Sequence, residues 1–126
     1  MLRTLLIVGA GGFIGSAMRY LVQILVEKNL TSTFPYGTLA ANIAGSFLIG
    51  IIYALGEKGD LMSPEWRMFM AVGLCGGFTT FSSFAYNNFT MIRENSFGQL
   101  IFNVGGSLFL GLLAVYLGVI LIRSIY

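Results

Sequence analysis

Four long apolar runs dominate the chain, and short polar stretches separate them. The hydrocarbon core of a bilayer is about 30 Å thick and requires roughly 20 helical residues. The apolar runs are long enough to cross it, at residues 4–26, 34–55, 66–92 and 97–122. We therefore expect an all-α membrane protein in which residues 1–126 form one domain of four transmembrane helices.

The polar stretches predict short connections at residues 27–33, 56–65 and 93–96. Ser96 is placed to cap the start of the fourth helix. Pro35 and Pro64 lie near the starts of the second and third helices, where the missing N–H of proline costs little. The third and fourth runs exceed the minimum length, so these helices can tilt, break or project past the bilayer.

Composition supports the membrane assignment and excludes several functions. The chain is 56% hydrophobic and only 10% charged, whereas a soluble domain is about one quarter charged. It has no histidine, and its five carboxylates all lie between the apolar runs. This pattern leaves no intramembrane carboxylate for a proton relay and no nucleophile–base pair for an enzyme. The net charge of +2 includes no basic cluster that would bind nucleic acid.

Charge gives only a small signal for orientation. Four crossings place both termini and the second connection on one side of the membrane. That side carries Arg3, Lys58, Arg67 and Arg123, and the other carries Lys28 and Arg93, with Arg19 inside the first helix. Because positive charge on the connections sets orientation, this small difference leaves two alternatives: one fixed orientation, or insertion in both.

Small residues recur four positions apart in every predicted helix. This pattern lets helix backbones approach closely in a membrane, and it predicts a compact homo-oligomer, namely a dimer. The alternative is that glycine is simply frequent in membrane helices. The spaced sets are Gly11/Gly15, Gly37/Ala41/Gly45, Ser46/Gly50, Gly73/Gly77 and Ser107/Gly111.

Polar side chains also fall near the middle of the membrane. Lipid offers them no hydrogen-bond partner, so they must face protein, water or an ion. They predict either a ladder of neutral donors through the protein or hydrogen bonds that tie helices together. The residues are Asn42 in the second run, Thr79, Thr80, Ser82 and Ser83 in the third, and Asn103 and Ser107 in the fourth.

Phe81 and Phe84 share a face of the third helix beside these hydroxyl groups. The edge of an aromatic ring is positive, so ring edges near the Asn42 amide can line a path for a small anion. Ordinary packing of two core phenylalanines is the alternative. The predicted path contains no lysine or arginine, and an anion that must also leave should not be held by a full positive charge.

Two further features each have two interpretations. Gly76 and Gly77 allow the third helix to break, and the freed carbonyls, with the Thr79 hydroxyl or carbonyl, would then coordinate a cation. Close packing of helices is the other explanation for these glycines. Arg19 either extends to the membrane surface or draws anions into a vestibule.

These residues resemble the Fluc (CrcB-type) family of microbial fluoride channels over essentially the whole chain. Three segments carry the resemblance. They are Gly11-Gly12-Phe13-Ile14-Gly15 with Arg19-Tyr20, then Gly37-Thr38-Leu39-Ala40-Ala41-Asn42-Ile43-Ala44-Gly45-Ser46-Phe47, and Gly73-Leu74-Cys75-Gly76-Gly77-Phe78-Thr79-Thr80-Phe81-Ser82-Ser83-Phe84.

The resemblance implies a passive channel that exports fluoride from the cytoplasm across the inner membrane and so lowers its toxicity. It implies an antiparallel, dual-topology homodimer in membrane lipid, with two fluoride pores and a central structural sodium ion. The carbonyls of Gly76 and Thr79 would hold the sodium, and Arg19 would lie in the vestibule. The implied pore residues are Asn42, Phe81, Phe84, Ser83 and Ser107.

Two features of the chain depart from the family pattern. A Ser-Thr pair is usual between the two phenylalanines, and this chain has Ser82-Ser83, which keeps the hydroxyl. On the fourth helix, Asn103 and Gly111 stand where a tyrosine and a hydroxyl residue are frequent. The outer part of the pore route is therefore the least defined by the resemblance.

Two other functions remain as alternatives. A small multidrug antiporter has a similar size and number of crossings, but it requires an intramembrane carboxylate, which the four runs lack. A subunit that assembles without transporting anything is the second alternative. It predicts that replacing Asn42 or Phe81 would harm assembly instead of ion flux.

Overall fold

The computed structural model describes residues 1–28, 34–58 and 62–126. Four helical spans in it are long and apolar enough to cross a membrane, which confirms the predicted all-α fold with four crossings. Parts of the first two predicted connections, residues 29–33 and 59–61, lie outside the described residues. The elements are α1 Leu2–Lys28, α2 Tyr36–Glu57, α3 Pro64–Arg67, η1 Met68–Cys75, α4 Gly76–Phe78, α5 Phe81–Arg93 and α6 Phe97–Ile125.

The third span, Pro64–Arg93, consists of four consecutive elements instead of one helix. It begins at a sequence signal for a helix start: the Ser63 hydroxyl accepts a hydrogen bond from the Trp66 N–H at 3.2 Å, and Pro64 occupies the first turn. A π-helical segment, η1, leads to the short α4, after which the helix stops and restarts as α5. The predicted break near the centre of this span is therefore confirmed.

The turn between α5 and α6 is tight, as expected, but Ser96 does not act as predicted. Ser96 occupies the N-cap position of α6 without a capping hydrogen bond from its side chain. The turn is instead closed by the backbone: Asn95 has a φ of 58°, its N–H bonds to Ile92, and the Ser96 N–H bonds to Met91. This pattern is a Schellman motif, and asparagine tolerates the left-handed conformation that it requires.

Helix α1 packs along η1 and α4 through glycine on both sides. A Cβ atom at Gly73 would lie 2.7 Å from the Val8 carbonyl oxygen, and one at Gly77 would lie 2.6 Å from the Gly12 carbonyl oxygen. A Cβ at Gly15 would collide with the backbone of Leu74. Close packing, one of the two interpretations of the glycines in the third span, therefore holds for Gly73 and Gly77.

Helices α2 and α6 meet in the same way. A Cβ at Gly50 would collide with the Val115 carbonyl, and one at Gly118 would collide with the Phe47 carbonyl. Spaced small residues are thus used for contacts within one chain. They no longer support a dimer by themselves, and Gly118 was not part of the predicted pattern.

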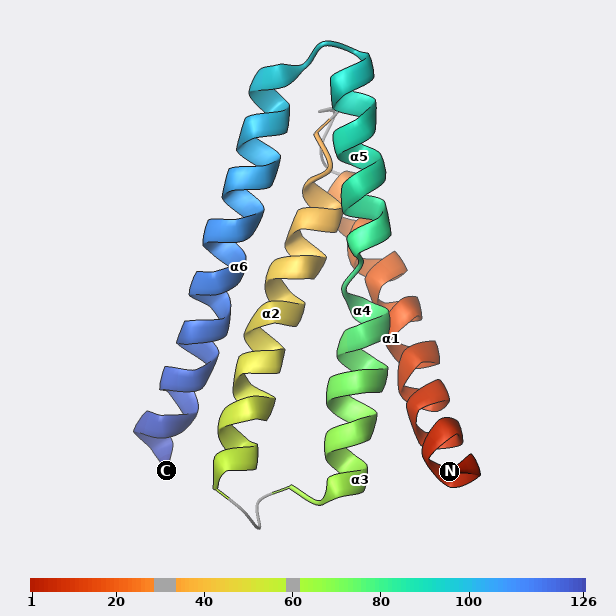
Figure 1. Ribbon diagram of the computed structural model, residues 1–126, viewed down its shortest axis with the longest axis vertical. Coiled ribbons are helices and arrows are strands. Elements are labelled where there is room, and N and C mark those ends of the chain that lie inside the picture. Colours follow the sequence, from red (N-terminus) through yellow and green to blue (C-terminus); the bar gives the residue numbers. More distant parts are fainter. Residues whose placement is uncertain (29–33, 59–61) are drawn as a thin grey trace.

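Figure 1 shows the resulting arrangement: α6 and α2 lie on one side, and α1 and the broken third span lie on the other. The N- and C-termini lie at the same end of the molecule, as an even number of crossings requires, and the α5–α6 turn lies at the opposite end. The break between α4 and α5 is near mid-height, beside α2. It therefore lies near the middle of the third span.

Candidate functional site

The site is built around two extended residues in the third span. Thr79 has φ and ψ of −87° and 155°, and Thr80 has −148° and 121°. The Thr79 hydroxyl donates to the Cys75 carbonyl at 2.9 Å, and the Thr80 hydroxyl accepts from the Ser83 N–H at 3.2 Å. Because threonine side chains can replace backbone hydrogen bonds in this way, the sequence itself favours a break here. It lies two residues after Gly77, whereas Gly76 and Gly77 remain helical.

Asn42 of α2 stabilises the break. Its Oδ1 accepts from the Thr80 N–H at 2.9 Å, and its Nδ2 donates to the Thr80 carbonyl at 3.2 Å. In a continuous helix that N–H would bond to the Gly76 carbonyl. The amide oxygen therefore replaces the acceptor that the break removes from the Thr80 N–H, and Nδ2 adds a second bond that ties α2 to the break. A primary amide has two N–H donors, so one remains for the space in front of it.

Arg19 of α1 contacts the break from another helix. Its Nε donates to the Gly77 carbonyl at 3.1 Å, and the residue is half-buried. In a continuous helix this carbonyl would accept from the N–H of Phe81, which is the first residue of α5. The guanidinium thus satisfies a carbonyl that the break leaves unpaired. Its assignment to a vestibule stays a prediction.

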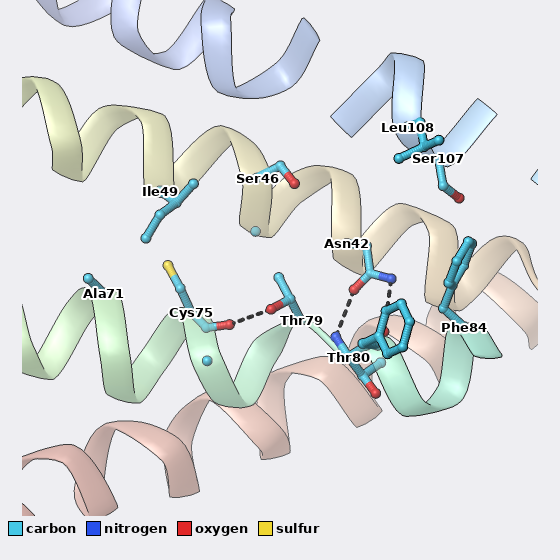
Figure 2. Close-up of a pocket in the computed structure, with 13 residues that line it drawn as sticks. Asn42, Ser46, Ile49, Ala71, Cys75, Thr79, Thr80, Phe84, Ser107 and Leu108 are labelled. Carbon is cyan, nitrogen blue, oxygen red and sulfur yellow. Dashed lines mark hydrogen bonds between the residues drawn. The ribbon is translucent and has the colours of Figure 1, made fainter. Parts of the chain in front are cut away.

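An open pocket of about 460 Å³ lies in front of the break (Figure 2). It brings together six of the predicted site residues, whereas Ser83 and Arg19 lie outside its lining among the residues that the structure describes. None of its lining residues is charged. The lining consists of Asn42, Gly45, Ser46, Ile49, Ala71, Cys75, Gly76, Thr79, Thr80, Phe81, Phe84, Ser107 and Leu108.

The two phenylalanines of α5 stand at one end of this pocket. Their ring centroids are 6.0 Å apart, with 45° between the ring planes. Phe84 is half-buried and lies near Ser107 of α6 in the close-up, whereas the ring of Phe81 is 78% exposed. The chain on its own therefore leaves one side of the aromatic pair uncovered.

The break also frees carbonyl oxygens. The Thr80 N–H bonds to Asn42 and the Ser83 N–H bonds to the Thr80 hydroxyl, so the carbonyls of Gly76 and Thr79 lose their helical donors. Carbonyl oxygens suit hard cations. Within the described part of the chain, no group of three or more His, Cys, Asp or Glu residues could hold a metal ion.

Ser46 belongs to the pocket, although we predicted it only as a packing residue. It lies four residues after Asn42, so the two polar side chains share one face of α2. Figure 2 shows both on the side of α2 that faces the pocket. The i, i+4 spacing of Asn42 and Ser46 within a mainly apolar helix was the sequence signal that could have identified Ser46.

Asn103, in contrast, turns away from the pocket lining. It is only 2% exposed, and its Nδ2 donates to Oδ1 of Asn88 at 2.8 Å. This amide pair ties α6 to α5, which is the interhelical role considered for such residues. Gly111 lies opposite Ser46, where an added Cβ would be 3.7 Å from the Ser46 hydroxyl. The space that a hydroxyl residue would occupy at position 111 is therefore next to the pocket.

Known proteins resemble this chain over most of its length. Residues 6–119 match the family model described as CrcB-like protein, Camphor Resistance (CrcB). A protein named fluoride-specific ion channel FluC from Flavobacterium psychrophilum is 37% identical over 98% of this chain and 100% of its own length. A protein of the same name from Chlorobium phaeobacteroides is 46% identical over 90% of this chain and 88% of its own length.

The relatives are channels, in agreement with the expectation that the protein is not an enzyme. Together with the four spans, they make this a multi-pass membrane protein. The chain belongs to the CrcB-like family.

Proposed function

We propose that the chain is the subunit of a passive, fluoride-selective channel. The observation that carries the proposal is the uncharged pocket at mid-span, where the Asn42 amide, the Thr80 and Ser107 hydroxyls and the Phe84 ring meet. Two relatives that cover nearly the whole chain are named fluoride-specific ion channels, which supports the same ion.

The lining explains how an anion could bind and still leave. A fluoride ion that sheds water needs several hydrogen-bond donors, and amide, hydroxyl and ring-edge groups supply them without a fixed charge. A lysine or arginine in the same place would hold the ion too tightly, because conduction requires weak binding at successive sites. Ser83 lies beside the pocket on α5 and would extend the donor path.

The functional unit is an antiparallel homodimer with two pores. The 78% exposed ring of Phe81 and the exposed Gly76, where a Cβ would meet no atom within 4 Å, support this assembly. Both residues line the open pocket, so a second copy placed against it would close the path on its uncovered side. The nearly balanced positive charge at the two ends permits insertion in both orientations.

A sodium ion at the dimer centre would be held by the freed carbonyls of Gly76 and Thr79 from both subunits. Gly76 is exposed, and the N–H groups that would bond to these two carbonyls in a continuous helix bond to side chains instead. Both observations support this assignment. Such an ion would fix the two breaks to each other by neutralising carbonyl dipoles. The test is to exchange sodium for N-methyl-D-glucamine: fluoride flux and the melting temperature of the dimer should both fall, and unchanged values would remove sodium from the proposal.

The physiological role follows from weak-acid chemistry. When the medium is acidic, hydrogen fluoride diffuses into the cell and dissociates, so fluoride accumulates in the cytoplasm. A channel in the inner membrane that passes fluoride alone lowers this level. Transport needs no energy source besides the fluoride gradient and the membrane potential.

Efflux from liposomes tests the function directly. Liposomes that contain the purified protein should release fluoride rapidly once an ionophore balances charge, and they should retain chloride. Release that requires a proton gradient would instead favour the antiporter. No release of either ion from folded, assembled protein would refute the channel and favour the assembly subunit.

A further inference from the structure

A second pocket, of about 390 Å³, extends the site toward one end of the molecule. It shares Ile49 and Ala71 with the pocket at the break, so the two adjoin along the groove between α2 and η1. Figure 2 shows Ile49 and Ala71 at the end of the first pocket that is remote from Phe84. We call the combined feature the α2–η1 groove.

The outer end of the α2–η1 groove is lined by Arg67, Gly56 and Glu57. Arg67 is the last residue of α3, at the end of the molecule where both termini lie (Figure 1). Its guanidinium lies over Gly56, with Nη2 at 3.5 Å from the Gly56 carbonyl. A Cβ at position 56 would lie 3.0 Å from the same nitrogen. A residue larger than glycine would therefore crowd the guanidinium in this position.

The local charge at this end of the groove is positive. The carboxylate of Glu57 is paired with Arg123 at 3.0 Å and is therefore neutralised. In the described parts of the chain, Arg67 makes no ion pair; the pairs found there are Arg3–Glu65 and Arg123–Glu57. Among the described residues, the charged lining of the mouth together with Arg123 therefore carries one net positive charge.

We propose that Arg67 collects anions at the mouth of the α2–η1 groove, and that fluoride enters or leaves the uncharged pocket by this route. The inference rests on the proposed channel function. Arg67 precedes Thr80 by 13 positions, which is roughly 20 Å along a helix. At that distance the charge attracts ions without binding them in the pocket. A groove with apolar walls and one sign of charge raises the local concentration of the opposite ion.

Single-channel recording tests this role. Arg67→Gln and the wild-type protein are compared in neutral phosphatidylcholine bilayers at about 10 mM potassium fluoride, without and with about 300 mM potassium gluconate. The Debye length falls from about 30 Å near 0.01 M salt to below 8 Å above 0.15 M. We expect Arg67→Gln to reduce the fluoride current about twofold to fourfold at low salt, and the gluconate should largely abolish the difference.

Two control variants separate electrostatics from structure. Arg67→Lys keeps the charge and should restore the low-salt current. Arg3→Gln removes a positive charge at the same end of the molecule but outside the groove lining, and it also leaves Glu65 unpaired, so it should reduce the low-salt current less than Arg67→Gln does. Wild-type current in Arg67→Gln at low salt, or an equal loss at both salt concentrations, would overturn the proposal. Absence of fluoride current in the wild type would instead refute the channel function itself.

Discussion

Asn42 shows how one side chain can serve both of the roles predicted for it. Its amide makes two hydrogen bonds to the backbone of Thr80, and these bonds stabilise the break and tie α2 to the third span. The same residue lines the uncharged pocket and keeps one N–H donor. Holding helices together and lining an anion path are therefore not exclusive, because an amide has more hydrogen-bonding groups than the break consumes.

Replacing Asn42 by aspartate should separate the role of the amide oxygen from the role of the amide N–H groups, because it keeps an acceptor and removes the donors. A carboxylate keeps the acceptor for the Thr80 N–H but faces the Thr80 carbonyl with no donor. Losing a hydrogen bond and leaving its partner unsatisfied costs about 1–3 kcal/mol, and the negative charge repels the permeating anion. We expect a lower melting temperature and a strongly reduced fluoride efflux. Wild-type efflux from Asn42→Asp would mean that the residue only ties the helices together.

Phe81 should matter for ion flux and little for the fold. Its ring is 78% exposed within the chain, so Phe81→Ile removes few internal contacts but deletes the ring edge from the pocket. We expect fluoride efflux to be nearly abolished while the assembled protein elutes normally in gel filtration. Phe89→Ile is the matched control, since Phe89 is an exposed α5 phenylalanine outside the pocket lining. Equal efflux from the two variants would exclude the ring-edge mechanism.

At the scale of the elements, the third span is shaped by its neighbours. Thr79 and Thr80 supply local caps, while Asn42 of α2 and Arg19 of α1 satisfy the backbone groups on either side of the break. A break in the middle of a membrane is tolerated only where protein or a cavity replaces the lost hydrogen bonds. These two side chains and the pocket provide that replacement.

The contact between α1 and α4 depends on glycine, and Gly77→Ala tests it. The added methyl group would lie 2.6 Å from the Gly12 carbonyl oxygen, and only separation of the two backbones relieves this. Overpacking of this kind costs about 1–3 kcal/mol, and it would also disturb the bond from Arg19 to Gly77. We expect a lower melting temperature. Gly9→Ala, where the methyl group meets no atom within 4 Å, should be neutral or stabilising.

At the scale of the whole molecule, one chain leaves its site half open. The pocket at the break is bounded by α2, the third span and α6, and the exposed Phe81 and Gly76 lie on its uncovered side. Four helices enclose little volume by themselves. The second copy proposed above would therefore complete the path as well as stabilise the subunit.

Insertion in both orientations can be measured by labelling. In a Cys75→Ala background, Ser124→Cys and Ser96→Cys place single thiols near opposite ends of the molecule. With an impermeant maleimide and intact cells, we expect about half of the protein to react from outside at each position, because the charge bias is small. Complete labelling at one position and none at the other would establish a single orientation and refute the antiparallel dimer.

The four crossings and the residue types of the site could be predicted from the amino-acid sequence alone. Hydropathy is a sum over neighbouring residues, and polar groups at mid-membrane stand out without knowledge of their partners. Asn42, Phe81, Phe84 and Ser107 were found in this way or by family resemblance, and the pocket contains them all. Ser96 occupies the predicted N-cap position of α6, but its side chain accepts no capping hydrogen bond, because its φ and ψ of −92° and 63° are not the extended conformation usual for a capping residue.

The folded structure was needed to show how the break in the third helix is completed and which contact each glycine makes. The Thr79 and Thr80 side chains favour the break locally, and Asn42, 38 positions before Thr80, completes it by bonding to the Thr80 backbone. Gly77 packs against α1, where an added Cβ would lie 2.6 Å from the Gly12 carbonyl oxygen. Arg19 bonds to the Gly77 carbonyl, and Asn103 pairs with Asn88, because the packing of the helices brings these distant residues together. A hydrogen bond or a close backbone contact between distant segments depends on how helices are placed, and local sequence patterns do not contain that placement.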